Sequence, residues 1–397
     1  MSRPLMRIPY TQPLPPPLII PPSAATKQGA ISALFHFLTS SAASSEHTQS
    51  QKKTVLLTGA GISVASGLAD YRGQNGTYTQ NKNYRPIYFH EFVASHEARK
   101  RYWARSFLGW RGLHRSSPNA THFAVRDLGR LGLVDSVITQ NVDSFHRLAH
   151  PALHTVELHG FLRSLICLSC KKLMDRDAFQ TRLAELNPAW AAFLQELLKS
   201  GALDTENPVE RRKKGFRTNP DGDADVPGAP YTMFRYPACP SCLKRPPILS
   251  DGSKGHVDVD KDGAWVPSST STNGVGVLKP NVIMFGESIP ASVKAEAEAA
   301  IDAAGRILVI GSSLATYSAW RLVKHAHERG MGIGILNMGG VRKEELFFGE
   351  YRHHDNGAGD GMSASRREVV RASLPSEEIL PAVVELVQEY QRHYQHH

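Results

Sequence analysis

Long apolar runs and cysteines are both scarce in this chain. Its 397 residues contain no stretch of about 18 apolar residues, the length that a transmembrane helix requires, so none is expected. Four cysteines in a chain of this size are too few for a disulfide scaffold. The apolar content of 41% is nevertheless ample for a core, and the length suits one large domain or two modest ones.

Acidic residues are absent from residues 1–45, which carry three basic residues among many Ser and Pro. This composition resembles a mitochondrial presequence, although prolines between positions 13 and 22 would interrupt an amphipathic helix. The alternative is a disordered tail. We therefore expect residues 1–25 to be a presequence or a disordered tail. The expected location is the mitochondrial matrix, with the cytoplasm or nucleus as alternatives. The formal net charge of +9 suits an acidic partner or a cofactor with phosphates.

The stretch from Thr54 to Arg72 carries the first candidate site. The apolar, β-branched run at residues 54–57 predicts a buried parallel strand, and it leads directly into Gly59-Ala60-Gly61. Residues 62–68 then predict the start of a helix. Outward N–H groups and the helix dipole at such a turn favour a phosphate. The spacing departs from G-x-G-x-x-G, and Asp70-Tyr71-Arg72 follows closely, which disfavours a dehydrogenase fingerprint.

Further apolar strands also end in polar or small residues. In an open α/β sheet the carboxyl ends of the strands are where ligands bind. Histidine is the side chain that exchanges a proton near neutral pH, although a single histidine is more often structural. The expected strands, each with the residues that follow it, are 134–139 with Gln140-Asn141-Val142-Asp143, 153–158 with His159-Gly160, 307–310 with Gly311-Ser312-Ser313, and 332–336 with Asn337.

All four cysteines fall in two C-x-x-C pairs, Cys167 with Cys170 and Cys239 with Cys242. Two such knuckles complete a tetrahedral, all-thiolate zinc site, which is structural because no position is left for water. Redox chemistry is the alternative for a C-x-x-C motif. The polar insertions 205–230 and 249–276 are not expected to build a core. Arg211-Arg212-Lys213-Lys214 is better interpreted as a solvated charge run than as a nucleic-acid patch.

Periodicity predicts the remaining elements. The aromatic rings of the helix expected at 90–110 are assigned to core or lid packing. The predicted helices are 26–39, 90–110, one from Ser117-Pro118 to Gly132, 178–199, 291–304, 317–329 and one from Ser376, and an apolar strand is predicted from 278 to the glycine at 286.

In order, the chain contains GAGIS, TQNVD, HG, the two C-x-x-C pairs, KPNVIMFGE, GSS and Asn-Met-Gly. This set resembles the sirtuins, the NAD-dependent protein deacylases, from about residue 26 to 387 apart from the two insertions. RYWARSFLGW at 101–110 is most similar to the class II branch that is mitochondrial. The chain departs from the family pattern at Ala69, where Pro is usual, at Met338, where a smaller β-branched residue is usual, and in the insertions.

The resemblance implies an α/β fold, a Rossmann-like parallel sheet with helices on both faces, plus a smaller zinc-binding module. The Rossmann-like domain would comprise residues 26–165 and 279–390. The zinc module with its insertions would span 166–278, and 391–397 would be a tail.

The resemblance also implies which residues act. NAD is the implied cofactor, beside one structural zinc ion. His159 would be the general base on the ribose hydroxyls, with Asn141 and Asp143 as further catalytic residues. Acyl-lysine protein substrates would bind at Met284, Phe285, Gly286 and Glu287. The implied NAD-binding residues are Gly59, Ala60, Gly61, Ile62, Asp70, Tyr71, Arg72, Gln140, Asn141, Val142, Asp143, Gly311, Ser312, Ser313, Asn337, Met338, Gly339 and Ser376.

The implied activity is NAD-dependent lysine deacylation, in which NAD is cleaved to nicotinamide and the acyl group passes to ADP-ribose. Protein ADP-ribosyl transfer and longer-chain deacylation or lipoamidase activity are alternatives on the same fold. A non-catalytic zinc-ribbon module that binds nucleic acid is an alternative of a different class, and the polar residues at the strand ends count against it. Neither a specific nucleic acid nor a membrane is expected as a partner, and the oligomeric state is left open.

Overall fold

Six parallel strands form the central sheet of the computed structural model, in the order β11–β10–β9–β1–β2–β3. The chain runs outward from β1 in both directions, so the strand order reverses there and the carboxyl ends open a crevice. The bounds are β1 Thr54–Thr58, β2 Val134–Thr139, β3 His154–Glu157, β9 Arg306–Ile310, β10 Gly332–Leu336 and β11 Val369–Ala372. The structure describes residues 13–40, 53–80, 84–199, 217–218, 224–226, 228–249, 251–267, 274–351 and 367–394.

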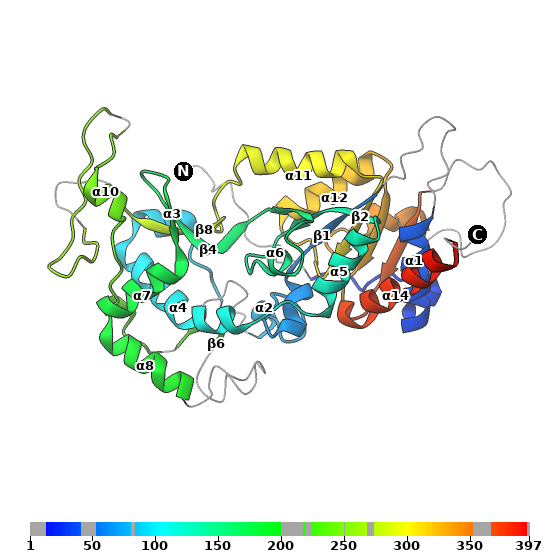
Figure 1. Cartoon of the computed structure of the whole chain (residues 1–397), viewed down its shortest axis with the longest axis horizontal. Coiled ribbons are helices and arrows are strands. Elements are labelled where there is room, and N and C mark those ends of the chain that lie inside the picture. Colours follow the sequence, from blue (N-terminus) through cyan, green and yellow to red (C-terminus); the bar gives the residue numbers. More distant parts are fainter. Residues whose placement is uncertain are drawn as a thin grey trace.

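Helices cover both faces of this sheet (Figure 1). On one face, α1 (Lys27–Thr39), α5 (Ala120–Arg130) and α14 (Ser376–Tyr394) bury their apolar sides in one core cluster. On the other face, α11 (Ala291–Ala303), α12 (Tyr317–Glu328) and α13 (Glu345–Phe348) form a second cluster with the strands. The expected Rossmann-like architecture is confirmed.

A smaller module contains a three-stranded antiparallel sheet in the order β5–β4–β8. Its core continues into the four-cysteine region and the helices packed on it. Its strands are β4 Gly160–Cys167, β5 Leu173–Asp175 and β8 Leu278–Val282, and its helices are α3 Phe89–Ala94, α4 His96–Arg115, α7 Arg176–Leu186, α8 Pro188–Lys199 and α10 Pro240–Lys244. The other short elements are η1 Pro22–Ala25, η2 Ala60–Ser66, α2 Thr77–Gln80, α6 Phe145–Ala149, β6 Arg217–Thr218, β7 Ala224–Asp225, η3 Tyr231–Met233 and η4 Gly349–Tyr351.

Two expected helices are each divided in two. The helix predicted at 90–110 is α3 followed by α4, because the Ser95 side chain accepts the N–H of Ala98 (3.1 Å) and begins a new helix. The helix predicted at 178–199 is α7 followed by α8. The side-chain amide of Asn187 separates them by bonding the carbonyl oxygens of Leu183 and Arg235. Periodicity continues across both breaks, so it could not reveal them.

Three boundaries also differ from expectation. The helix predicted from Ser117-Pro118 begins at Ala120, because Asn119 caps it by accepting the N–H of Thr121 (2.9 Å). Residues 60–66 form the 3₁₀ helix η2 rather than an α-helix. The strand predicted to run from 278 to Gly286 ends at Val282, since Glu287 folds back to accept the N–H of Met284 (3.0 Å).

The expectation that residues 249–276 build no core was wrong for their described part. Trp265 is 7% exposed and stacks on Tyr236, with ring centroids 5.9 Å apart. The guanidinium carbon of Arg99 lies 4.6 Å from the centroid of the Trp265 ring. Because the segment is polar in its overall composition, that composition did not reveal that the large apolar ring of Trp265 packs in the core. The charge run 211–214 lies outside the described residues. None of the helices within the described ranges is long and apolar enough to cross a bilayer.

Three histidines form a buried cluster beside Thr58, the last residue of β1. His146 lies between the hydroxyl of Thr58 (Nε2 to Oγ1, 2.8 Å) and His150 (Nδ1 to Nε2, 2.8 Å). The His122 ring centroid is 5.1 Å from that of His146. Burial lowers the pKa of His122 to about 3 and also lowers the pKa of His146 and His150. All three rings are therefore neutral in the folded protein.

We predict that acidification weakens the fold through this cluster. Below pH ~6.5 the unfolded chain binds protons that the folded protein excludes, so the free energy of unfolding falls by up to about 1.4 kcal/mol per pH unit for each histidine. Urea unfolding at pH 7.5, 6.5 and 5.5 measures this slope. His122→Phe should reduce the slope, whereas His154→Gln, at an exposed position, should keep it. An equal slope in His122→Phe and the wild type would contradict the assignment.

Candidate active site

The carboxyl ends of the central strands open into a cleft of about 1720 Å³. Its walls come from both parts of the molecule: Gly59 and Gln140 follow β1 and β2, Tyr102 and Arg105 lie on α4, and Leu162 lies on β4. The cleft therefore lies where the central sheet meets the smaller module, as the reversal of strand order at β1 leads one to expect.

The structure brings most of the predicted site residues together in this cleft. Two predicted cofactor residues are not part of its lining. Ile62 is 1% exposed and packs in the core, and Ser376 is 6% exposed with its hydroxyl 3.2 Å from that of Thr121. The predicted residues that line the cleft are Gly59, Ala60, Gly61, Asp70, Tyr71, Arg72, Gln140, Asn141, Val142, Asp143, His159, Met284, Phe285, Gly286, Glu287, Gly311, Ser312, Ser313, Asn337, Met338 and Gly339.

The floor of the cleft is a contact between two glycine turns. A Cβ on Gly59 or Gly61 would lie 2.8 Å from atoms of Gly311, whose φ of +62° also favours glycine. The N–H of Gly61 donates to the carbonyl oxygen of Gly311 (2.9 Å), and the N–H of Ile62 donates to that of Gly59 (3.1 Å). These two N–H groups are therefore paired within the protein, so they are not among the outward N–H groups that were expected at this turn. The glycines let the backbones after β1 and β9 meet.

Polar side chains after β2 connect this floor to its surroundings. The Gln140 amide donates to the Ser312 hydroxyl (2.8 Å), and its oxygen accepts the Thr316 hydroxyl (3.0 Å). Asn141 donates to the carbonyl oxygen of Gly59 (3.1 Å). Asp143 accepts the Ser63 hydroxyl (2.7 Å), and burial raises the pKa of its carboxyl group. These bonds hold the three side chains in fixed positions along the cleft wall.

His159 follows β3 and lines the same cleft. Its Nδ1 lies 3.1 Å from the carbonyl oxygen of Gln140. Because a carbonyl can only accept, Nδ1 carries the proton and Nε2 holds the lone pair. Nε2 lies 2.9 Å from the Ser318 hydroxyl, which donates to it. Burial lowers the pKa of His159 to about 4, so the ring is neutral and able to accept a proton at physiological pH.

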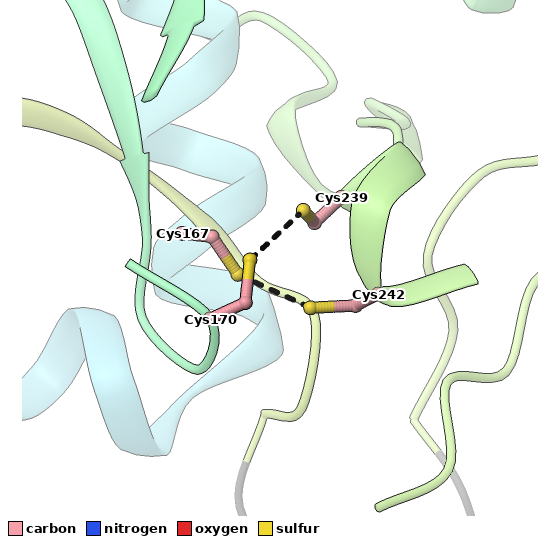
Figure 2. Close-up of side chains that lie close together, drawn as sticks. All are labelled: Cys167, Cys170, Cys239 and Cys242. Atoms are coloured by element: carbon pink, nitrogen blue, oxygen red, sulfur yellow. Dashed lines mark hydrogen bonds between the residues drawn. The ribbon is translucent and has the colours of Figure 1, made fainter. Parts of the chain in front are cut away.

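The four cysteine sulfurs converge at the edge of the smaller module (Figure 2). All four lie within 4.8 Å of one another, with Cys167 3.5 Å from Cys242 and Cys170 3.8 Å from Cys239. Zn–S bonds of about 2.3 Å in a tetrahedron place sulfurs roughly 3.8 Å apart. Burial raises the pKa of the Cys242 thiol, so the thiolates of a zinc site would form here only beside a cation that balances their charge. This donor set fits one zinc ion.

The Sir2 family model matches residues 59–318 of the chain. The chain belongs to the Sir2 family. NAD-dependent protein deacylase SIR4 of Batrachochytrium dendrobatidis is 40% identical over 301 residues, which cover 74% of this chain and 83% of that protein. NAD-dependent protein deacylase SRT2 of Arabidopsis thaliana is 34% identical over 299 residues, or 75% and 69% of the two chains. The predicted membership of the sirtuins is thereby confirmed.

The fold of this Sir2-family chain is also similar to that of a solved structure described as "Structural Basis for the Mechanism and Regulation of Sir2 Enzymes". The two share a TM-score of 0.51 and 24% identity, over 91% of this chain and 98% of the other. This likeness supports the architecture alone. Membership of the class II branch stays a prediction.

Several cleft residues of this Sir2-family chain were not found from its sequence. Ser63 bonds Asp143 and Ser318 bonds His159, but each partner is distant in sequence and no local pattern marks the pair. Tyr102 and Arg105 lie in the aromatic segment that was assigned to packing. That assignment fits Trp103, which is fully buried. The side chains of Tyr102 and Arg105 instead line the cleft.

We expect Cys239→Ser to lose bound zinc and to unfold at a lower temperature, since the metal ties two chain segments that are otherwise distant. Metal analysis and thermal unfolding of the purified protein measure both effects. Ser241→Ala, in the same knuckle, is the matched control and should keep one zinc ion per chain. A Cys239→Ser protein with full zinc content and unchanged unfolding temperature would contradict the proposed site.

Proposed function

We propose that this chain is an NAD-dependent protein-lysine deacylase, which cleaves NAD to nicotinamide and transfers the acyl group to ADP-ribose. The observation that carries the proposal is the neutral imidazole of His159 in a cleft shared by the central sheet and the smaller module. The relatives named as NAD-dependent protein deacylases support it.

The residues that line the cleft fit a dinucleotide. Bound NAD would supply an electrophilic ribose carbon and nicotinamide as the leaving group. Gln140, Asn141 and Asp143 would hold the nicotinamide ribose, because their side chains are already fixed by neighbouring bonds. Asp70 and Arg72 would lie over the nicotinamide end of NAD. Gly311, Ser312 and Asn337 would hold the rest of the dinucleotide, at a contact of small residues that leaves room for it.

His159 would act as the general base. Its Nδ1–H is committed to the Gln140 carbonyl, so Nε2 faces the cleft as the acceptor. A ribose hydroxyl would replace the Ser318 hydroxyl at Nε2 and give up its proton there. Because burial disfavours the imidazolium, the proton would be held only briefly and passed on. The ring orientation needs no rearrangement for this step.

The substrate peptide would bind beside the loop that follows β8. Lys279 is 3% exposed, and its ammonium donates to the Glu287 carboxylate (2.9 Å), which also accepts the N–H of Met284 (3.0 Å). The loop that contains Phe285 and Gly286 is held rigidly by this pair. An extended peptide could add its backbone to such an edge. A structural zinc ion at the four cysteines would hold the opposite wall.

We also propose that the preferred acyl group carries a terminal carboxylate. Arg105 is 6% exposed and lines the cleft from α4, as do Tyr84, Ile87 and Tyr102 from their own segments of the chain. Its guanidinium carbon lies 5.9 Å from the centroid of the Tyr84 ring. A guanidinium that lines a cleft can bind the carboxylate of a ligand through two parallel hydrogen bonds. This would set succinyl- or glutaryl-lysine above acetyl-lysine.

Two alternative functions can be separated from deacylation by experiment. Protein ADP-ribosyl transfer breaks the same glycosidic bond, so product analysis separates it: O-acyl-ADP-ribose indicates deacylation and labelled protein indicates transfer. A nucleic-acid module would instead bind DNA with a steep salt dependence and release no nicotinamide. We also propose a mitochondrial location, supported by residues 1–12, which contain Arg3 and Arg7 and no acidic residue. Residues 18–39 do not count toward such a presequence, because they pack on the core of the folded domain.

We predict that His159→Ala abolishes deacylation while NAD still binds, because the base is lost and the cleft walls remain. Product formation is followed by mass spectrometry of an acyl-lysine peptide, and NAD binding by calorimetry. His154→Ala, at an exposed position, should keep full activity. If the His159→Ala enzyme turned over at the wild-type rate, this histidine would not be the base.

The acyl preference is tested with Arg105→Met, which keeps the length of the side chain and removes its charge. The kcat/KM for succinyl- and glutaryl-lysine peptides should fall by about 10- to 100-fold, the loss of a charge-assisted pair. The value for the acetyl-lysine peptide should change little. Arg101→Met, on the exposed side of α4, is the control. Equal losses for charged and uncharged acyl groups would contradict the proposed role.

A further inference from the structure

Residues 13–21, here called the N-terminal strap, lie against the edge of the central sheet and reach its cleft. Ile20 pairs with Arg371 of β11 in an antiparallel bridge, through two backbone hydrogen bonds of 2.9 and 2.7 Å. Leu18 and Ile20 pack on the core cluster of one sheet face, and Ile19 packs on that of the other. The strap therefore continues the sheet beyond its edge strand, with strand-like alternation of side chains.

One buried ion pair holds both the strap and the loop at residues 337–340. Arg371 and Glu344 are 0% and 1% exposed at their side chains and 2.5 Å apart. Glu344 accepts the N–H of Leu18 (3.1 Å). The Arg371 guanidinium donates to the carbonyl oxygens of Asn337 (2.9 Å) and Gly339 (2.6 Å). Removing two charges from water is costly unless their hydrogen bonds are satisfied, and here the strap and the loop satisfy them.

The strap touches the loop again at Gly340. A Cβ on this glycine would lie 1.8 Å from the carbonyl oxygen of Pro15 and 3.2 Å from Cβ of Leu14. Any larger residue at 340 would therefore displace the strap. Leu14 itself lines the cleft, together with Met338 and Gly339. An apolar side chain from outside the Sir2-matched region thus forms part of the wall beside the loop at 337–340.

We propose that the N-terminal strap completes the adenosine end of the NAD site, with Leu14 as a contact residue for the cofactor. The inference rests on the proposed function, since the family resemblance implies that the adenosine end of NAD lies near residues 311–313 and 337–339. An apolar side chain beside a planar base stabilises it by excluding water. The strap would then be a fixed wall, required for full NAD affinity and irrelevant to peptide binding.

The experiment measures NAD and ADP-ribose affinity by calorimetry in chains shortened at the N-terminus. A chain beginning at Pro13 keeps every contact described above and should bind as the full chain does. A chain beginning at Leu18 keeps the Glu344 and Arg371 contacts but lacks Leu14 and Pro15. Its Kd for both ligands should rise by roughly three- to tenfold, the loss expected for one apolar contact. Its affinity for an acyl-lysine peptide should not change.

Gly340→Ala supplies a second, independent variant, because its Cβ would displace the strap without shortening the chain. It should weaken NAD binding to a similar degree in the full chain and have no further effect in the chain that begins at Leu18. Unchanged or tighter NAD binding without residues 13–17 would overturn the proposal. An equal effect of Gly340→Ala in both chains would also overturn it. A protein that binds no NAD in any form would instead refute the proposed function itself.

Discussion

The contact between the glycine turns after β1 and β9 is the constraint on which the cleft depends. Gly59 and Gly61 approach Gly311 so closely that one added Cβ would force the turns apart. Because the turns meet, Gln140 can reach Ser312 and Asn141 can reach Gly59. The polar side chains are thereby positioned before any ligand binds, which is the condition under which they stabilise developing charge effectively.

Burial gives this site its electrostatic character. His159 stays neutral and Asp143 has a raised pKa because both are withdrawn from water. Lys279 lies buried against Glu287, and the guanidinium carbon of Arg105 lies 5.9 Å from the centroid of the Tyr84 ring. Withdrawal from water strengthens each of these electrostatic interactions. The same burial makes an uncompensated charge on a ligand costly, so the cleft favours ligands whose groups complement its own.

Separate segments of the chain build the walls of the cleft, and different interactions hold them. The smaller module is organised by the four cysteines and by the aromatic packing of Trp265 on Tyr236. At the other end, the Arg371–Glu344 pair binds the strap to the loop at 337–340. These two walls are thus held by contacts away from the floor, which the turns after β1 and β9 supply. Changes in a wall can therefore alter which ligands fit the cleft without displacing His159.

Local patterns and fixed spacings were enough to predict the strands at 134–139 and 332–336, to pair the four cysteines, to single out His159 as a candidate and to identify the family. The folded structure was needed to show that Gly61 bonds Gly311, that Arg105 lines the cleft and that Leu14 reaches its rim. The Gly61–Gly311 contact and the position of Leu14 depend on residues that are far apart in the chain. For Arg105, the sequence of its helix did not show which side faces the cleft. The spacing of residues along the chain predicts local helices, strands and motifs. Which distant side chains meet depends on how those elements pack.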